Sequence, residues 1–376
     1  LRALHEHEYK DAMRRGIVAD PDHPRALKDA VKPVGICEDM CPELERVGRI
    51  VQRDVWAAEA VRQARTGRGY NKIVADEGRM VKKFRRSAAG SEEQLPSDLR
   101  PPKVLQRTVN YLIDEVIDKS DFAKVQTFVW DRTRAIRNDF SIQQVAKLHD
   151  VRIAIDCFER IVRFHILSLH QMARRGIREE DYSHQQDLEQ LMKALYSLMR
   201  YYTDFKNKYH SANEAEFRAY YIILAIMNHD PLLDDQIHSL PSNLLNDPII
   251  KTALKLYDAA SNSLDKKGPS RKRPKIQEHG QEDWARFWQI VDSAQMSYLM
   301  SCCAEIIFNN MRRLALRSIW KGFRQGRQVN VQDWTTEALL EPLRFDCQED
   351  VHDFCQQHGF RFATASDGTE YLDLNS

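Results

Sequence analysis

The sequence predicts a mainly α-helical chain of stacked helical hairpins that ends in a small α+β winged helix. Glycine (14) and proline (13) are sparse among the 376 residues, and charged residues make up 30%. Apolar residues recur every three or four positions through the middle of the chain, which is the helical spacing. Near the end, an Asp-Gly pair separates two short alternating runs, which is a strong hairpin signal. These observations favour helices throughout and strands only in the tail.

The middle of the chain shows readable helix starts. Capping signatures, in which a small polar side chain accepts from the first backbone amides, stand at Ser141–Gln144, Ser183–Gln186 and Asn213–Glu216. Asp247-Pro248 predicts one more start, with proline at the first helical position. Amphipathic helices joined by short polar turns are typical of a solenoid, in which each pair buries its face on the next. We therefore expect stacked hairpins here.

The tail has a different pattern. It predicts a helix that ends near Lys321, an extended 328–331, a helix over 333–340 and a helix over 348–357 stopped by Gly359. Two strands, 360–364 and 370–374, then flank Asp367-Gly368. This order of elements is that of a winged helix.

The length favours two or three domains. We expect an N-terminal helical region with a basic segment (1–90), a helical-repeat domain (91–304) with a mobile basic loop (262–280), and a winged-helix domain (305–376). The first residue is Leu1, which suggests a piece of a longer protein. No run of about 18 apolar residues predicts a membrane span. The seven cysteines, mostly inside apolar helical patterns, suit a reducing compartment.

Catalytic and metal sites are not expected. The sequence contains no phosphate-binding glycine loop, nucleophile elbow or zinc-protease helix. Cys37 and Cys41 lack further ligands at metal-binding spacing. A second set has spacings that do not form a tetrahedral cage: Cys347, His352, Cys355 and His358. We expect no enzyme, no metal and no cofactor, and keep a nucleic-acid-processing enzyme only as a distant alternative.

The net charge of +1 conceals basic stretches. On a helix, the side chains of one such stretch share an arc opposite Leu316, Ile319 and Phe323, which is a suitable geometry for following a phosphate backbone. The predicted nucleic-acid-binding residues are Arg313, Arg317, Lys321, Arg324 and Arg327. A solvated face or a surface for an acidic protein is the alternative. A secondary basic loop, equally suited to nuclear import, contains Lys266, Lys267, Arg271, Lys272 and Arg273.

The helix at 348–357 argues against base recognition. Its Glu349, Asp350 and Asp353 repel phosphates, so nucleic-acid contacts should be made to the backbone and tolerate any sequence. This winged helix also suits protein contact. The aromatic candidates for such contact are Trp334, Phe345, Phe362 and Tyr371.

Several long motifs occur in order. The most specific is Asp39-Met40-Cys41-Pro42-Glu43, within 35–46, followed by motifs at 87–90, 95–102, 108–112, 128–143, 163–166 and 213–221. By these motifs the chain resembles the Sac-three/GANP family of nuclear messenger-RNA export scaffolds. The local chemistry of the motifs is structural: 95–102 predicts an extended connector. A charged set in 130–140 predicts ion pairs between stacked helices: Asp131, Arg132, Arg134, Arg137 and Asp139.

The resemblance implies a PCI-like superhelix that pairs with a PCI-domain subunit and a small acidic Sem/DSS-type protein. It also implies a basic surface for RNA or DNA, a DEAD-box RNA helicase as a partner, and attachment to the nuclear pore through regions outside this chain. The expected location is the nucleus, on the nucleoplasmic side of the pore. The alternative within the same fold is a PCI-type subunit of a transcription-elongation or proteasome-lid-like complex with protein-only interactions.

Overall fold

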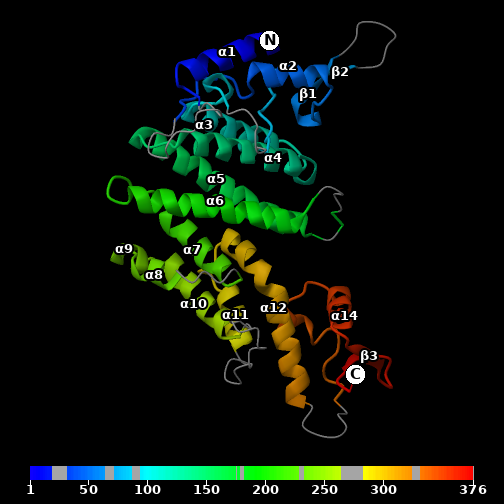
Figure 1. Cartoon of the computed structure of the whole chain (residues 1–376). Coiled ribbons are helices and arrows are strands. Elements are labelled where there is room, and N and C mark those ends of the chain that lie inside the picture. The colour runs from blue at the N-terminus through cyan, green and yellow to red at the C-terminus, as the bar shows by residue number, and fades with distance from the viewer. Residues whose placement is uncertain are drawn as a thin grey trace. The chain divides into compact units, whose positions relative to one another are not determined.

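The computed structural model describes residues 1–18, 32–63, 72–86, 94–174, 176–177, 182–227, 233–263, 283–323 and 331–375. The chain divides into two compact units, residues 1–212 and 213–376 (Figure 1). Helices dominate both units and a small α+β arrangement ends the chain, so the predicted fold class is confirmed. None of the helices in these ranges is both long and apolar enough to span a membrane. The three predicted domain ranges stay predictions.

The stacked helices of the first unit carry its core. In order, they are α3 (Pro102–Asn110), the π-helical stretch η4 (Tyr111–Ile117), α4 (Phe122–Gln143), α5 (Leu148–Met172) and α6 (His184–Phe205). The helix α5 packs against α3, α4 and α6, and α5 and α6 lie side by side (Figure 1). Fifteen side chains of α5 are buried, as expected for a helix with neighbours on several sides.

An N-terminal segment with less regular structure precedes these helices. It contains α1 (Arg2–Arg14), α2 (Glu43–Val51), the 3-10 turns η2 (Ala57–Glu59) and η3 (Pro96–Asp98), and an antiparallel hairpin of β1 (Ala60–Gln63) and β2 (Lys72–Ala75). The sequence patterns predict no strand in this segment. The predicted connector 95–102 has extended backbone at Leu95 and Pro101, with η3 between them.

The predicted helix starts hold at three positions and fail at one. The Ser183 hydroxyl accepts from the Gln186 amide at the start of α6, α7 (Glu214–Ala225) follows Asn213, and α10 (Pro248–Ser263) begins at its proline. The start predicted at Ser141 is wrong, because α4 continues through that residue and α5 begins only at Leu148. Gln144, which would complete the capping box, is instead the left-handed C-cap of α4 with a φ of +44°. The preceding Gln143 side chain donates to the backbone oxygens of Arg100 and Asp139, both at 2.9 Å, at the end of that helix.

The second unit continues with helices. After α7 come α8 (Leu233–His238), α9 (Ser242–Leu245), α10, α11 (Asp283–Val291) and α12 (Tyr298–Phe323). The helix α10 packs against α7 and α11, and α12 packs against α7 and α11. A buried Trp288 side chain in α11 donates to the Pro342 backbone oxygen at 3.1 Å, and so joins the helices to the α+β end.

The α+β end contains α13 (Leu340–Leu343), α14 (Gln348–Gln357), β3 (Arg361–Thr364) and β4 (Glu370–Asp373). The helix predicted over 348–357 is confirmed, and so is its glycine stop, since Gly359 has a φ of +85°. The predicted hairpin is also confirmed: β3 pairs antiparallel with β4, and Gly368 takes a φ of +88° in the turn. Its core buries the second half of α12 against Leu343, Val351, Phe354 and Leu372.

The helix predicted over 333–340 is wrong. Thr335 instead forms a β-bridge with Tyr371, and the Leu372 amide donates to the Trp334 backbone oxygen at 2.8 Å. Pairing with β4 therefore holds Trp334 and Thr335 out of a helix, turns follow over 336–339, and a helix forms only from Leu340 to Leu343.

Candidate nucleic-acid interface and binding groove

The predicted basic residues on α12 share one exposed face. Arg313, Arg317 and Lys321 are exposed at successive four-residue intervals. On the other side, Leu316 and Ile319 are buried in the core of the α+β end. The helix is thus anchored by Leu316 and Ile319 and presents three cations to solvent, whereas Phe323, expected on the apolar side, is 41% exposed. Arg324, Arg327 and the secondary basic loop lie outside the described residues.

Arg312, which belongs to the same basic stretch, has a structural role. Its guanidinium donates to the backbone oxygens of Leu343 (2.8 Å) and Arg344 (2.7 Å), and it lies 3.8 Å from the ring centroid of Phe345. Burial lowers the pKa of this guanidinium. Its neighbour Arg313 donates to Asn310 of the same helix and remains exposed.

The helix α14 carries the opposite charge. Glu349 and Asp353 are exposed, whereas Val351, Phe354 and Cys355 face the core. Near the C-terminal end of α14, the pKa of His358 is lowered by burial and, to a smaller extent, by the positive charge of Arg313. The basic face of α12 and the end of α14 are therefore within electrostatic reach of each other.

The aromatic residues predicted for partner binding all have intramolecular contacts. Trp334, Phe345 and Phe362 pack against the core of the α+β end. Trp334 meets Phe323 edge-on at 5.7 Å between centroids, and Phe362 stacks on His352 at 4.9 Å. Tyr371 is half-buried in β4 opposite Ala363. Only the exposed edges of these four aromatic side chains are available to contact a partner protein.

The ion pairs expected between stacked helices form differently. The buried Asp139 carboxylate of α4 accepts from Lys82 and Arg100, both at 2.7 Å. Arg132, also buried, pairs with its neighbour Asp131 and with Glu59. Except for Asp131, the partners come from the irregular N-terminal segment and not from a stacked helix, so the expected pairing is corrected. We call Gly35, Glu59, Lys82 and Arg100, with their backbone neighbours, the N-terminal clasp.

Gly35, the first residue of the motif at 35–46, is held at close quarters in the clasp. The Gly35 amide donates to the Gln143 side chain of α4 at 3.0 Å, and the Cys37 amide to the Leu99 backbone oxygen at 3.0 Å. A Cβ on Gly35 would lie 2.6 Å from that same Leu99 oxygen, closer than side chains tolerate. A glycine at position 35 is therefore required for this close approach to the backbone of Leu99 and Arg100.

Chemistry at the buried polar groups is limited. His165 and Ser168 both contact the Asp187 carboxylate, at 2.6 and 2.5 Å, so the serine hydroxyl is directed at the carboxylate and not at the histidine. Burial lowers the pKa of His165. Burial also raises the pKa of the Cys41 and Cys355 thiols to about 12, which disfavours the reactive thiolates. Across the described ranges, no group of three His, Cys, Asp or Glu residues is placed to hold a metal.

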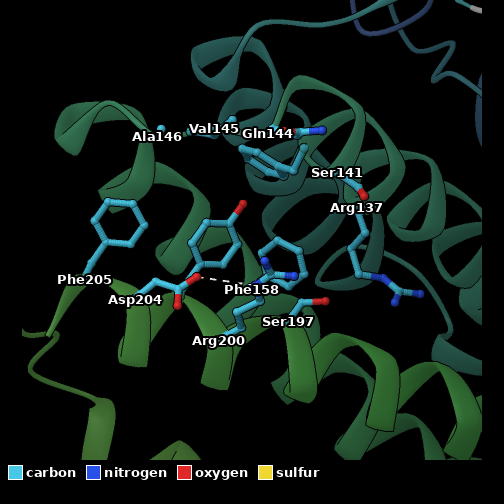
Figure 2. Close-up of a pocket in the computed structure, with 12 residues that line it drawn as sticks. Arg137, Ser141, Gln144, Val145, Ala146, Phe158, Ser197, Arg200, Asp204 and Phe205 are labelled. Atoms are coloured by element: carbon cyan, nitrogen blue, oxygen red, sulfur yellow. Dashed lines mark hydrogen bonds and ion pairs between the residues drawn. The ribbon is translucent and has the colours of Figure 1, made fainter. Parts of the chain in front are cut away.

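A groove of about 550 Å³ lies between the end of α4 and the second half of α6 (Figure 2). Its lining combines arginine, aromatic and small side chains: Arg137, Phe140, Ser141, Phe158, Ser197, Arg200, Tyr201, Asp204 and Phe205, with the turn 144–146. The sequence patterns predict an ion pair for Arg137 and do not indicate this groove. One signal was present: no acidic residue stands three or four positions from Arg137, where a helix would supply a partner.

Comparisons with known proteins place these features in a family. The model of the SAC3/GANP family matches residues 40–364. The chain is similar to SAC3 family protein 1 of Schizosaccharomyces pombe, with 36% identity over 378 residues, covering 100% of the chain and 34% of that protein. It is also similar to protein xmas of Drosophila melanogaster (30% identity over 88% of the chain) and to SAC3 family protein B of Arabidopsis thaliana (28% over 87%). The matched regions span only 15% and 18% of those two proteins.

Proposed function

The chain belongs to the SAC3/GANP family, and from that premise we propose that it is the non-enzymatic scaffold segment of a nuclear messenger-RNA export complex. It pairs with a PCI-domain subunit and a small acidic Sem/DSS-type protein, and the complex binds RNA or DNA through the phosphate backbone. A DEAD-box RNA helicase is a further partner. Regions outside this chain attach the complex to the nucleoplasmic side of the nuclear pore.

The observation that carries the nucleic-acid part of the proposal is the basic face of α12. Three exposed cations at four-residue intervals lie on a helix whose opposite side is fixed in the core. Such cations neutralise successive phosphates without reading bases, and binding is then strongly salt-dependent. Because the supporting side is buried, the positions of these cations are held by the fold.

The α+β end supports the pairing with a protein subunit. It combines short helices with the two-stranded hairpin of β3 and β4, and α14 carries exposed Glu349 and Asp353, whereas a helix that reads DNA needs cations. We assign α14 to protein contact and α12 to the nucleic-acid backbone. The stacked helices of the first unit then provide the surface on which further subunits assemble.

The experiment is co-purification of the chain with PCI-domain and Sem/DSS-type subunits, followed by titration with single-stranded RNA at several salt concentrations. Three phosphate contacts should make the slope of log affinity against log salt concentration steeper by about 2 than in a chain without them. This contribution alone lowers the RNA affinity about 20-fold between 50 and 200 mM salt. Reversing Arg313, Arg317 and Lys321 to glutamate removes this contribution. The control reverses Lys251 and Lys255, which are exposed on α10 of the same unit.

Each outcome has a definite meaning. Loss of RNA affinity in the α12 variant, with the control intact, supports the proposal. Unchanged affinity of the α12 variant at low salt refutes the basic face. Failure to form the ternary complex favours the alternative, a PCI-type subunit of a transcription-elongation or proteasome-lid-like complex with protein-only interactions. The exposed acidic residues of α14 support this alternative, because they favour contact with a protein over contact with nucleic acid.

A further inference from the structure

The groove between α4 and α6 contains a cation without a counter-charge. The Arg137 Nη2 donates to the Gln190 side-chain oxygen at 2.6 Å, and its Nε is buried without an acceptor. None of the acidic side chains that the structure describes forms an ion pair with Arg137. By contrast, Arg132, one turn earlier on α4, meets two carboxylates.

The electrostatic surroundings of Arg137 are unfavourable. Its pKa is lowered to about 10, first by burial and then by the positive charge of Arg134. Arg134 is itself held between the rings of Phe84 and Trp130, at 4.0 and 4.5 Å from their centroids. The Arg137 guanidinium is still charged at neutral pH, so a partly desolvated cation remains uncompensated. An incoming carboxylate would supply the missing charge and a further hydrogen-bond acceptor.

Part of the groove lining is aromatic. Phe140, Phe158 and Tyr201 contact one another in series, at 5.9 and 5.6 Å between centroids. Phe140 and Phe158 are buried, whereas Tyr201 and Phe205 are half-exposed. Burial raises the pKa of the Tyr201 phenol to about 12, so it remains neutral at physiological pH. The half-exposed rings provide a contact surface for one large apolar side chain.

The two charged residues at the other end of the groove neutralise each other. Arg200 and Asp204 form an ion pair at 3.4 Å, drawn as a dashed line in Figure 2, and both are exposed. Arg137 extends from α4 toward α6, beside Ser197 (Figure 2). The groove therefore offers one uncompensated positive charge at one end and half-exposed aromatic side chains toward the other.

We propose that this groove binds a short acidic peptide segment of a protein partner, with a carboxylate on Arg137 and an aromatic side chain on Tyr201 and Phe205. A nucleic acid fits the groove less well, because affinity for a phosphodiester chain requires several uncompensated cations. Here Arg200 is already paired, and Asp204 repels phosphates at the rim. A peptide segment with one anchoring ring and one carboxylate matches both features.

The test uses the full 376-residue chain and a fluorescein-labelled peptide, Gly-Ser-Asp-Asp-Trp-Asp-Asp-Ser-Gly, followed by fluorescence anisotropy. Arg137→Gln removes a charged hydrogen bond, so we expect affinity to fall about 10- to 150-fold. The matched control is Arg174→Gln, which removes an exposed arginine near the end of α5. Phe205→Ala should weaken binding as well, while the triple α12 variant should leave it unchanged.

Peptide variants keep the test decisive if a protein variant fails to fold. On the wild-type chain, replacing the tryptophan by alanine or the aspartates by asparagines should each weaken binding at least about 10-fold. Absence of saturable binding up to about 1 mM peptide overturns the proposal. Equal affinity of Arg137→Gln and wild type for the peptide also overturns it. Displacement of the peptide by oligo-uridine RNA in the α12 variant overturns it as well, because the groove would then be a nucleic-acid site. These results do not depend on whether α12 binds RNA.

Discussion

Replacing Asp139 by asparagine tests whether the N-terminal clasp holds the first unit together. In the wild-type chain this carboxylate has no exposed surface and accepts from Lys82 and Arg100, both at 2.7 Å. Asparagine has nearly the same shape but no charge. The variant therefore leaves two buried cations facing a neutral amide, while the helix itself is little disturbed.

The expected decrease in the free energy of unfolding is large, because breaking a buried ion pair by removing one partner costs about 3–5 kcal/mol. In a unit of 212 residues, each kcal/mol lowers Tm by about 2–4 °C, so the variant should melt about 6–20 °C below wild type. The matched control is Asp114→Asn. It removes an exposed partner of Arg160, and such surface pairs contribute only about 0–1 kcal/mol.

The assay is thermal and urea unfolding of wild type and both variants, combined with amide hydrogen exchange. If the clasp is held by Asp139, exchange in Asp139→Asn should rise first around Lys82 and Leu99, before α5 opens. A Tm of Asp139→Asn equal to that of Asp114→Asn would refute the reasoning. A loss of amide-exchange protection that is spread evenly over the first unit would also refute it.

Three further substitutions test other parts of the structure. Gly35→Ala places a Cβ 2.6 Å from a backbone oxygen and should lower the free energy of unfolding by about 1–3 kcal/mol. Its control, Gly48→Ala, adds a Cβ in open space on α2 and should stabilise the chain slightly, so similar urea midpoints for the two variants would contradict this. Arg312→Ala should destabilise the second unit by about 1.5–3 kcal/mol, and Arg313→Ala by less than about 0.5, as measured by urea unfolding; the reverse order would disprove the structural role. Burial lowers the pKa of His165 below about 6.5, so near that pH the unfolded chain binds a proton that the folded chain does not, and the free energy of unfolding falls as pH drops through that value. In His165→Gln, the difference in the free energy of unfolding between about pH 7.5 and about pH 5.5 should therefore shrink, and an unchanged difference would count against this reasoning.

The elements that sequence reasoning predicted correctly depend on local signals. The hairpin of β3 and β4 follows from Asp367-Gly368, because a tight turn needs a residue that tolerates positive φ. The end of α14 follows from Gly359 for the same reason, and the start of α10 follows from Pro248. The exposed face of α12 follows from the four-residue spacing of its cations. In each case the deciding contacts lie within about one turn of the chain.

The elements that were missed depend on distant contacts. Ser141 and Gln144 have the residues of a capping box, but α4 continues to Gln143, whose side chain is held by the backbone of Arg100, 43 residues away. Thr335 and Trp334 pair with β4, which the local helix pattern could not reveal. The charges around Asp139 were recognisable as ion-pair candidates, yet nothing local indicates that Lys82 is the partner, 57 residues earlier. The groove was missed because its walls come from α4, α5 and α6 together.

The clasp also has a consequence for synthesis of the chain. Lys82 leaves the ribosome 57 residues before Asp139, which at 5–20 residues per second is a delay of about 3–11 seconds. During that interval Gly35, Glu59 and Lys82 have no α4 to dock on, and the apolar side chains between them are open to chaperones and proteases. The N-terminal segment is thus made first but can dock only after α4 has emerged, and slower translation over 83–139 would prolong its exposure.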